Sequence, residues 1–198
     1  MKIYNSLEQG TPEWLKRREL KFTASHASAI ATAGKGLETL AYNLFKEHIT
    51  GEKQNFEGNE ATRRGNELEP IARSIYEIEK DVSVEQVGFI ERDKYSGCSP
   101  DGLVGVDGMW EGKCVNAEKF KAIQEELKKP DSAYIWQCQM QILCAEREWC
   151  DLMYFHPDFE TNYKIFGIVK DYAKQERLII GLEIGRKLLL GHLEAYNI

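Results

Sequence analysis

Residues 98–114 read CSPDGLVGVDGMWEGKC, and this segment decides the fold expected around it. Two apolar runs flank Asp107-Gly108, a pair that favours a tight turn between antiparallel strands. In such a hairpin the start of one strand lies beside the end of the next, so Asp101 and Glu111 should come together. Because side chains alternate along a strand, Lys113 should share the face of Glu111.

The spacing Asp…Glu-x-Lys supplies the groups that metal-assisted phosphodiester hydrolysis requires. Two carboxylates can hold Mg²⁺ or Mn²⁺, and an ammonium beside them can hold a water or an oxyanion. The oxygen ligands lack the regular spacing of an EF-hand loop, which argues against that class of calcium site. Three charges beside a turn can also form no more than a solvated edge, so the metal interpretation requires support from other segments.

Length and composition indicate one soluble globular domain spanning residues 1–198. Of the 198 residues, 42% are hydrophobic, which is enough apolar material for a sizeable core. The apolar runs are too short for a transmembrane helix. The first six residues contain no apolar signal segment, so we expect a cytoplasmic protein with no membrane contact.

Cysteine spacing and net charge narrow the function classes further. The five cysteines form no Cys-x-x-Cys pair, which indicates reduced thiols. Cys138, Cys144 and Cys150 fit no common zinc or iron–sulfur spacing, so we expect buried apolar thiols. The net charge of −6 argues against a nonspecific nucleic-acid coat protein. A nuclease stays open, because metal-binding carboxylates contribute to that total and basic residues can be local.

The spacing of apolar residues and the positions of capping residues, proline and glycine predict a mixed α/β domain. Thr11 is suited to cap a helix that has Pro12 at its first position. The remaining helices are expected from about 23, at 37–50, 59–80, 117–128, 132–145 and 172–195, and strands at 82–91, 95–98, 102–107, 109–115, 149–156 and 163–169.

An acidic helix precedes the expected strands. Leu68 should face the core, and Glu67 is best interpreted as a solvated carboxylate. Glu69 lies just before Pro70, and we expect it to be a third acidic position at the metal site. Pro70 should kink this helix or mark its true start.

The order of acidic helix, Asp and Glu-x-Lys resembles the PD-(D/E)XK nuclease superfamily. Within it, the chain resembles the phage alkaline exonuclease family, the lambda exonuclease-like or YqaJ-type viral recombinases. The resemblance covers about residues 10 to 170 and depends on the joint order of several motifs. They are Glu13-Trp14-Leu15-Lys16-Arg17-Arg18 leading to Thr23-Ala24-Ser25, Gly65-Asn66-Glu67-Leu68-Glu69-Pro70, Ser99-Pro100-Asp101-Gly102-Leu103 with Glu111-Gly112-Lys113, and Tyr134-Ile135-Trp136-Gln137-Cys138-Gln139.

The resemblance implies a restriction-endonuclease-like core, in which helices flank a central mixed β-sheet. It also implies roles at a metal centre of two Mg²⁺ ions, for which Mn²⁺ can substitute. Asp101 and Glu111 would be direct ligands, together with the backbone carbonyl of Gly112. Glu69 would help to organise the metals, and Lys113 would orient the attacking water. Family members usually have a bulky apolar residue where this chain has Gly112, so the local packing is expected to differ.

Further motif positions imply contacts with the substrate. Gln137 would assist at the metal site, with Tyr134 nearby. By spacing, Arg18 and Ser25 match residues that bind the 5′-terminal phosphate, and Ser99 matches a serine that shares this task. The four histidines match no motif and are expected to be ordinary surface or core residues.

The implied activity is a Mg²⁺-dependent 5′-to-3′ exonuclease that acts on double-stranded DNA. It would release mononucleotides and leave a 3′ overhang for single-strand-annealing recombination. The implied partners are DNA ends, two further copies in a homotrimeric ring, and a phage single-strand annealing protein in the bacterial host cytoplasm. The alternatives are a repair or CRISPR-associated endonuclease of the same superfamily, a non-catalytic DNA-end-binding protein, and a small-molecule metallohydrolase.

Overall fold

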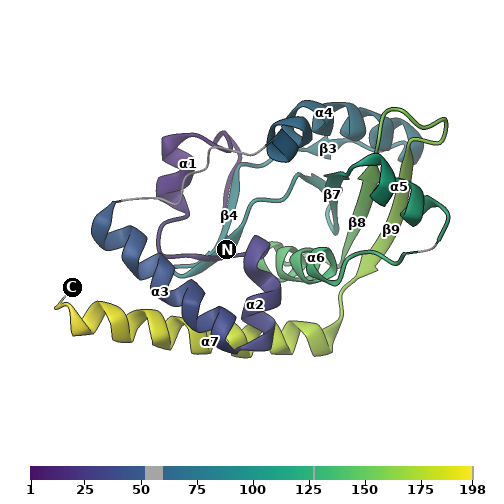
Figure 1. Ribbon diagram of the computed structural model, residues 1–198. Helices are drawn as coiled ribbons and strands as arrows, with labels where there is room; N and C mark the ends of the chain where they lie inside the picture. The colour runs from purple at the N-terminus through teal and green to yellow at the C-terminus, as the bar shows by residue number, and fades with distance from the viewer. Residues whose placement is uncertain (52–59, 127, 198) are drawn as a thin grey trace.

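Helices and strands are interspersed along the chain in the computed structural model, which describes residues 1–51, 60–126 and 128–197 (Figure 1). The elements in chain order are β1 (Lys2–Tyr4), α1 (Pro12–Arg17), β2 (Phe22–Thr23), the 3₁₀ turn η1 (Ala24–His26), α2 (Ala27–Thr32), α3 (Lys35–Thr50), α4 (Glu60–Lys80), β3 (Val84–Glu85), β4 (Phe89–Asp93), β5 (Ser96–Cys98), β6 (Gly102–Val104), β7 (Gly108–Cys114), α5 (Ala117–Gln124), α6 (Ser132–Ala145), β8 (Trp149–Phe155), β9 (Tyr163–Val169) and α7 (Tyr172–Ala195).

Two mixed sheets are formed by the strands of the described residues. The first has the order β1-β4-β5-β2 and the second the order β3-β6-β7-β8-β9. The first contains the parallel pair β2 with β5, and the second the parallel pair β7 with β8. The predicted mixed α/β class is confirmed, and α6 packs against strands of both sheets.

The chain passes from the first sheet to the second through residues 99–101. β5 ends at Cys98, β6 begins at Gly102, and Pro100 lies between them. Proline has no N–H to donate to a ladder, so strand pairing ends here. Ser99 and Asp101 therefore lie at the junction of the two sheets.

Helices form layers on both faces of the five-stranded sheet. On one face, Ala72 and Tyr76 of α4 pack against Trp110 and Met153. On the other face lies α6, and α7 packs beyond it with α2 and α3 (Figure 1). A side chain at Gly181 of α7 would lie 1.9 Å from a backbone oxygen of α2, so glycine permits the close approach of these two helices.

The predicted hairpin is confirmed, with its turn shifted by a few residues. β6 and β7 pair antiparallel, with Gly102 opposite Trp110. The positive φ of the turn, +54°, belongs to Gly105, whereas Gly108 is the first residue of β7. A Cβ at Gly108 would lie 2.1 Å from the ring of Trp149, so this glycine is required for packing instead of for the turn.

Most predicted elements agree with the observed ones within a few residues, and α6, β9 and α7 agree closely. The expectation that Pro70 marks a helix start is wrong, because α4 runs through it from Glu60. Proline removes only the hydrogen bond to the carbonyl of Asn66, which is exposed and can be hydrated. The expected first residue of this helix, Asn59, lies outside the described residues, as does residue 127 near the end of the expected helix at 117–128.

Two further expectations from composition concern the burial of the cysteines and the presence of membrane-spanning helices. Cys138, Cys144 and Cys150 are buried free thiols, as predicted, and Cys98 is buried as well. In the described parts of the chain, we find no helix with the length and apolarity that crossing a bilayer requires.

Candidate active site

Glu111 is the buried centre of a polar cluster on β7. Its side chain is only 1% exposed. Oε1 accepts hydrogen bonds from Lys113 Nζ at 2.5 Å and from Gln137 Nε2 at 2.6 Å. Oε2 accepts one from Gln141 Nε2 at 2.7 Å. Strand alternation puts Glu111 and Lys113 on one face, and α6 covers that face with both amides.

Asp101 and Glu69 bring two more carboxylates to this cluster. Asp101 accepts a hydrogen bond from the backbone N–H of Gly112 at 2.9 Å, which fixes it beside β7. Burial raises the pKa of Asp101 well above its usual range, and the charges of Glu111 and Glu69 raise it further. The pKa of Glu69, on α4, is raised by burial and then by Glu111. We call these three carboxylates and Lys113 the carboxylate cluster.

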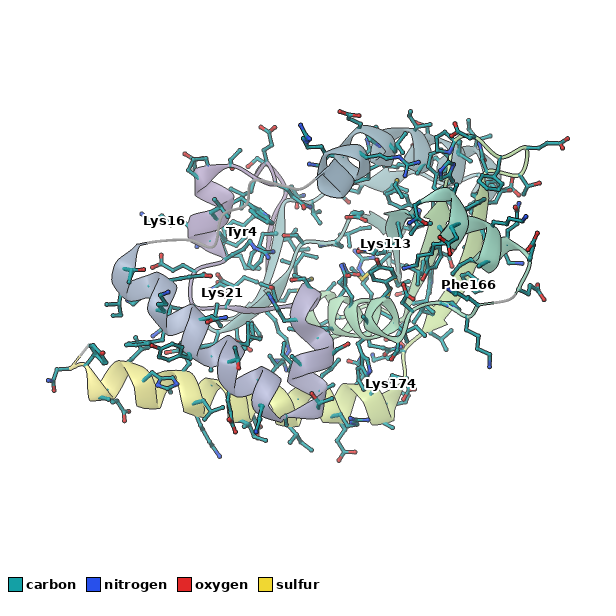
Figure 2. All side chains as sticks on the ribbon, in the orientation of Figure 1. Tyr4, Lys16, Lys21, Lys113, Phe166 and Lys174 are labelled. Carbon is teal, nitrogen blue, oxygen red and sulfur yellow. The ribbon has the colours of Figure 1, made fainter. Side chains whose placement is uncertain are left out.

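Lys113 is the ammonium within the carboxylate cluster. Figure 2 places its label near the middle of the molecule, away from Lys16 and Lys21. Burial alone would lower its pKa, but Glu111 and Asp101 together raise the pKa above the ordinary value. Its Nζ also lies 4.9 Å from the ring centroid of Tyr134, so the ring face supports the positive charge. Lys113 therefore remains protonated at neutral pH.

The carboxylate cluster has the right chemistry for a hard divalent cation. Its donors are carboxylate oxygens, and the pKa values of Glu69 and Asp101 are raised first by burial and then by the neighbouring carboxylates. Among the described residues, no group of three His, Cys, Asp or Glu side chains could hold a metal ion by itself. Mg²⁺ is commonly held by one or two carboxylates, with waters and substrate phosphates completing its shell. The residues fit a cation that is bound in this shared way.

A cavity of about 800 Å³ opens onto the cluster. Glu69 and Asp101 line it, together with Trp14, Arg63 and Asn66. Substrate could therefore reach the carboxylates from the side where α4 faces the N-terminal segment.

A second cavity, of about 770 Å³, is lined by Arg18 and by residues of the segment that follows β2. The Arg18 guanidinium stacks on the Trp14 ring at 4.1 Å, and its Nη2 donates to Thr23 Oγ1 at 3.4 Å. Burial lowers the pKa of Arg18 to about 10, an effect that Cys98 and Glu47 partly oppose. Arg18 therefore keeps its charge at neutral pH and faces a cavity that can receive an anion.

Two hydroxyls and an imidazole lie beside Arg18. Thr23 Oγ1 is 3.2 Å from Ser25 Oγ, and His26 Nδ1 is 3.3 Å from each of these oxygens. Burial lowers the pKa of His26, and the charge of Arg18 lowers it further. We call these four residues the Arg18 pocket. The expectation that His26 is an ordinary residue is incomplete, since it contacts both hydroxyls of the pocket.

Trp14 connects the Arg18 pocket to the carboxylate cluster. Its Nε1 donates to Ser99 Oγ at 2.9 Å and to the carbonyl of Gly88 at 3.1 Å. Ser99 lies two residues before Asp101 at the junction of the sheets. One buried indole therefore contacts the guanidinium of the pocket and the strand connection that carries a carboxylate of the cluster.

Gly112 is explained by the residue two positions before it. A Cβ at Gly112 would lie 2.8 Å from the Trp110 ring, which is fully buried and packs against Tyr76. The indole thus fills the space that a bulky residue at 112 would occupy. The local packing at Gly112 therefore differs as expected, while β7 runs unbroken from Gly108 to Cys114.

The predicted site residues fall into two groups and a link. The structure brings together, in and beside the carboxylate cluster, Glu69, Asp101, Glu111, Gly112, Lys113, Gln137 and Tyr134. Arg18 and Ser25 lie in the Arg18 pocket, and Ser99 lies between the two groups. Sequence reasoning missed Gln141, Thr23 and His26. The signal for Gln141 was its spacing of four from Gln137, which puts both amides on one helix face.

Residues 13–148 match the sequence profile of the YqaJ-like viral recombinase domain. The chain belongs to the YqaJ-like viral recombinase family. Comparison with curated proteins found no match. Among solved structures, this YqaJ-like recombinase is similar to an alkaline exonuclease, LHK-Exo, from Laribacter hongkongensis. The two are 33% identical with a TM-score of 0.84, over 94% of this chain and 96% of that one.

Two further structures support the assignment of the YqaJ-like chain. A complex of LHK-Exo with dAMP matches at 32% identity and a TM-score of 0.85, over 94% and 96% of the two chains. A phage-related exonuclease from Haemophilus somnus 129PT shares the fold, with 15% identity and a TM-score of 0.74 over 90% and 97%. The protein is thus a nuclease of the alkaline exonuclease and viral recombinase group.

Proposed function

We propose that the protein is a Mg²⁺-dependent exonuclease that degrades one strand of double-stranded DNA in the 5′-to-3′ direction. It releases mononucleotides and leaves a 3′ overhang for single-strand annealing. The observation that carries this proposal is the contact of Trp14 with both Arg18 and Ser99. This contact links the cationic Arg18 pocket to the carboxylate cluster, which supports a role of the pocket in binding a terminal phosphate near the hydrolytic groups.

The carboxylate cluster supplies the hydrolytic groups. Asp101, Glu111 and the Gly112 carbonyl would hold divalent cations, and Glu69 would organise them from α4. Bound Mg²⁺, as one ion or two, supplies electrostatic stabilisation of the oxygens that gain negative charge during an in-line displacement; Mn²⁺ can substitute. Lys113 orients the attacking water by donating to it, and its charge opposes the negative charge that develops on the phosphate.

Gln137 and Tyr134 complete the polar wall of the cluster. Gln137 already donates to Glu111, which leaves its carbonyl oxygen for other partners. Tyr134 contacts two ammonium groups, with Lys113 and Lys119 each 4.9 Å from its ring centroid. The electron-rich ring attracts both positive charges.

The Arg18 pocket supplies dependence on a DNA end. A guanidinium pairs well with phosphate oxygens, and the hydroxyls of Ser25 and Ser99 can donate to the same group. A terminal phosphate carries more negative charge than an internal one, so a buried cation favours the end of a strand. Cleavage would then begin at a 5′-phosphorylated end and proceed inward.

The biological setting belongs to the same proposal. We expect the enzyme to act on DNA ends in the cytoplasm of a bacterial host. Three copies would form a ring around the duplex, so that topology keeps the enzyme on its substrate even though its net charge is −6. A phage single-strand annealing protein would take up the 3′ overhang.

One substrate set tests the reaction. A linear duplex is prepared with matched 5′-phosphate and 5′-hydroxyl ends and labelled at its 5′ or 3′ terminus. Each form is incubated with enzyme in Mg²⁺ or in EDTA, and the products are resolved by length. We expect Mg²⁺-dependent release of labelled mononucleotides from phosphorylated 5′ ends.

Other outcomes would redirect the proposal. Internal cutting would assign the carboxylate cluster to an endonuclease, and equal rates on the two kinds of end would remove the phosphate role of the Arg18 pocket. A folded protein that cuts nothing in Mg²⁺ or Mn²⁺ would contradict the activity and favour DNA-end binding without catalysis.

A further inference from the structure

Gln141 is a buried glutamine to which the proposed mechanism gives no role. Its side chain is 0% exposed, and its Nε2 donates to Glu111 Oε2 at 2.7 Å. The Oε1 atom of the same amide is buried and has no hydrogen-bond partner among the described residues. An unpartnered buried acceptor destabilises a fold. A methionine or leucine would avoid that cost, so the retained amide points to a use for its N–H.

Gln137 and Gln141 lie one turn apart on α6 and donate to different oxygens of Glu111. Two donors that approach both oxygens fix the plane of the carboxylate as well as its position. Both amides are neutral, so they hold the carboxylate without adding a positive charge that would repel a cation. Lys113, which shares Oε1 with Gln137, does add such a charge.

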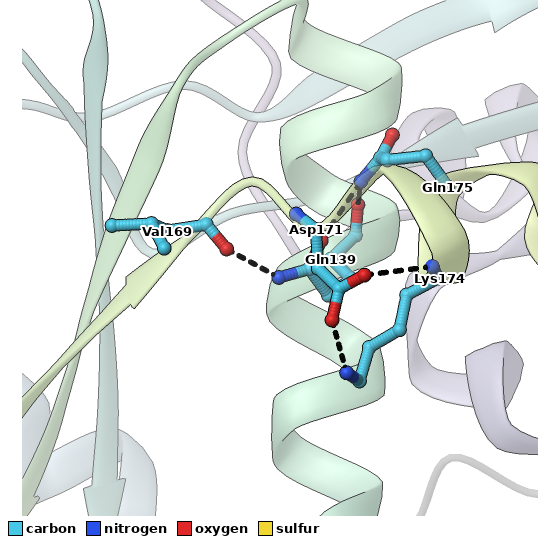
Figure 3. A network of polar contacts seen from close by, with 5 residues as sticks. All are labelled: Gln139, Val169, Asp171, Lys174 and Gln175. Atoms are coloured by element: carbon cyan, nitrogen blue, oxygen red, sulfur yellow. Dashed lines mark hydrogen bonds and ion pairs between the residues drawn. The ribbon is translucent and has the colours of Figure 1, made fainter.

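Gln139 is a natural contrast on the same helix. It is 1% exposed and contacts the junction of β9 and α7 instead of Glu111 (Figure 3). Its Nε2 donates to the carbonyl of Val169 at 2.7 Å, and its Oε1 accepts from the backbone N–H of Asp171 at 3.0 Å. Gln175 Nε2 donates to the backbone carbonyl of Gln139 at 2.7 Å and to the side-chain Oε1 of Gln139 at 3.0 Å. Gln139 thus anchors α6, whereas Gln141 reaches the carboxylate cluster.

We infer that Gln141 is a positioning residue that holds the Glu111 carboxylate in the orientation required to bind a divalent cation. The inference rests on the proposed function, because it assigns to Glu111 the role of a ligand. Hydrogen-bond partners of metal-binding side chains commonly change metal affinity by about 10- to 100-fold when they are removed. The effect should therefore be measurable without any DNA present.

The test uses calorimetric titration of the full-length protein with Mn²⁺ in the absence of DNA. Wild type, Q141M and Q139M are compared, since both variants replace a buried glutamine of α6 with an unbranched apolar residue. We expect Q141M to bind Mn²⁺ about 10- to 100-fold more weakly. We expect Q139M to keep the wild-type affinity while it lowers the urea midpoint of unfolding. In steady-state assays, Q141M should lower kcat and leave the KM for duplex ends unchanged.

A second variant protects the test against a folding failure. Q141N keeps a polar amide but is one methylene too short to reach Glu111, so it should weaken Mn²⁺ binding as Q141M does. Wild-type affinity in both Gln141 variants would overturn the inference, as would an equal loss of affinity in Q139M. A wild-type protein that binds no Mn²⁺ would overturn the proposed function together with this inference, whereas the other two outcomes concern Gln141 alone.

Discussion

The carboxylate cluster and the Arg18 pocket are connected through Trp14, yet they are built differently. The register of β6 and β7 fixes Asp101 and Glu111, and the short contacts of Glu111 span 2.5–2.7 Å. In the Arg18 pocket, Ser25 is exposed, and the polar atoms are 3.2–3.4 Å apart. The difference indicates that the polar atoms of the carboxylate cluster are more closely hydrogen-bonded than those of the Arg18 pocket.

The largest expected effect comes from breaking the cluster at Asp101. Asp101→Ala should reduce cleavage by roughly 10²–10³-fold or more, because it removes a proposed metal ligand. The fold should survive, since the same change removes one of several repelling charges. Cleavage assays in Mg²⁺, with circular dichroism as the folding control, check both statements. Near-normal activity would show that the cluster is assigned wrongly.

Lys113→Ala tests the other charge in the cluster. Turnover should be lost, and unfolding should be easier by about 3–5 kcal/mol, because Glu111 is left buried without its cationic partner. Metal binding should be retained, since Lys113 is not a ligand in the proposed site. Urea denaturation and Mn²⁺ calorimetry measure the two effects separately. Lost metal affinity in a folded variant would contradict the assigned role.

Arg18→Ala moves the test to the pocket, where a smaller effect is expected. Removing a charge-assisted contact should cost about 1.5–3 kcal/mol, which is roughly 10- to 100-fold in the preference for 5′-phosphorylated ends. Cleavage of hydroxyl ends should change little, because the carboxylate cluster is intact. Competition between the two kinds of end in one reaction measures this ratio. An unchanged ratio would place phosphate recognition elsewhere.

The smallest expected effect is a pH-dependent difference in stability between wild type and a variant at Asp101. Since the folded-state pKa of Asp101 is raised, its contribution to stability is fully present below the unfolded pKa and is lost as pH rises through the folded pKa. Asp101→Asn should therefore be more stable than wild type at pH 8, and its advantage should disappear toward pH 3. Urea midpoints of both proteins across this range provide the measurement. A pH-independent difference would mean that repulsion within the cluster is not its cause.

The local part of the fold was predictable because it depends on short-range pattern. The β6–β7 hairpin follows from two apolar runs around a turn, and the pairing of Asp101 with Glu111 follows from strand alternation. The turn residue was misplaced because Gly105 and Gly108 both suit a turn. Only the packed Trp149 ring shows that Gly108 belongs to the strand.

Other features could not be predicted because they depend on contacts between residues that are far apart in the sequence. The division into two sheets depends on how residues 99–101 leave one ladder for another, which no local pattern expresses. Gln139 and Gln141 are the same residue type and lie two positions apart on α6, yet their side chains contact different partners. Their roles are separated only by the packing of α6 between the sheet and α7.

The short connection between Ser99 and Asp101 would also limit the size of each product. The two residues are two positions apart, so their Cα atoms are separated by at most about 7 Å. If the serine holds a terminal phosphate and the aspartate serves the bond being cut, the backbone between them acts as a ruler. The step length of the enzyme would then be set by a fixed stretch of polypeptide, with Pro100 stiffening its middle.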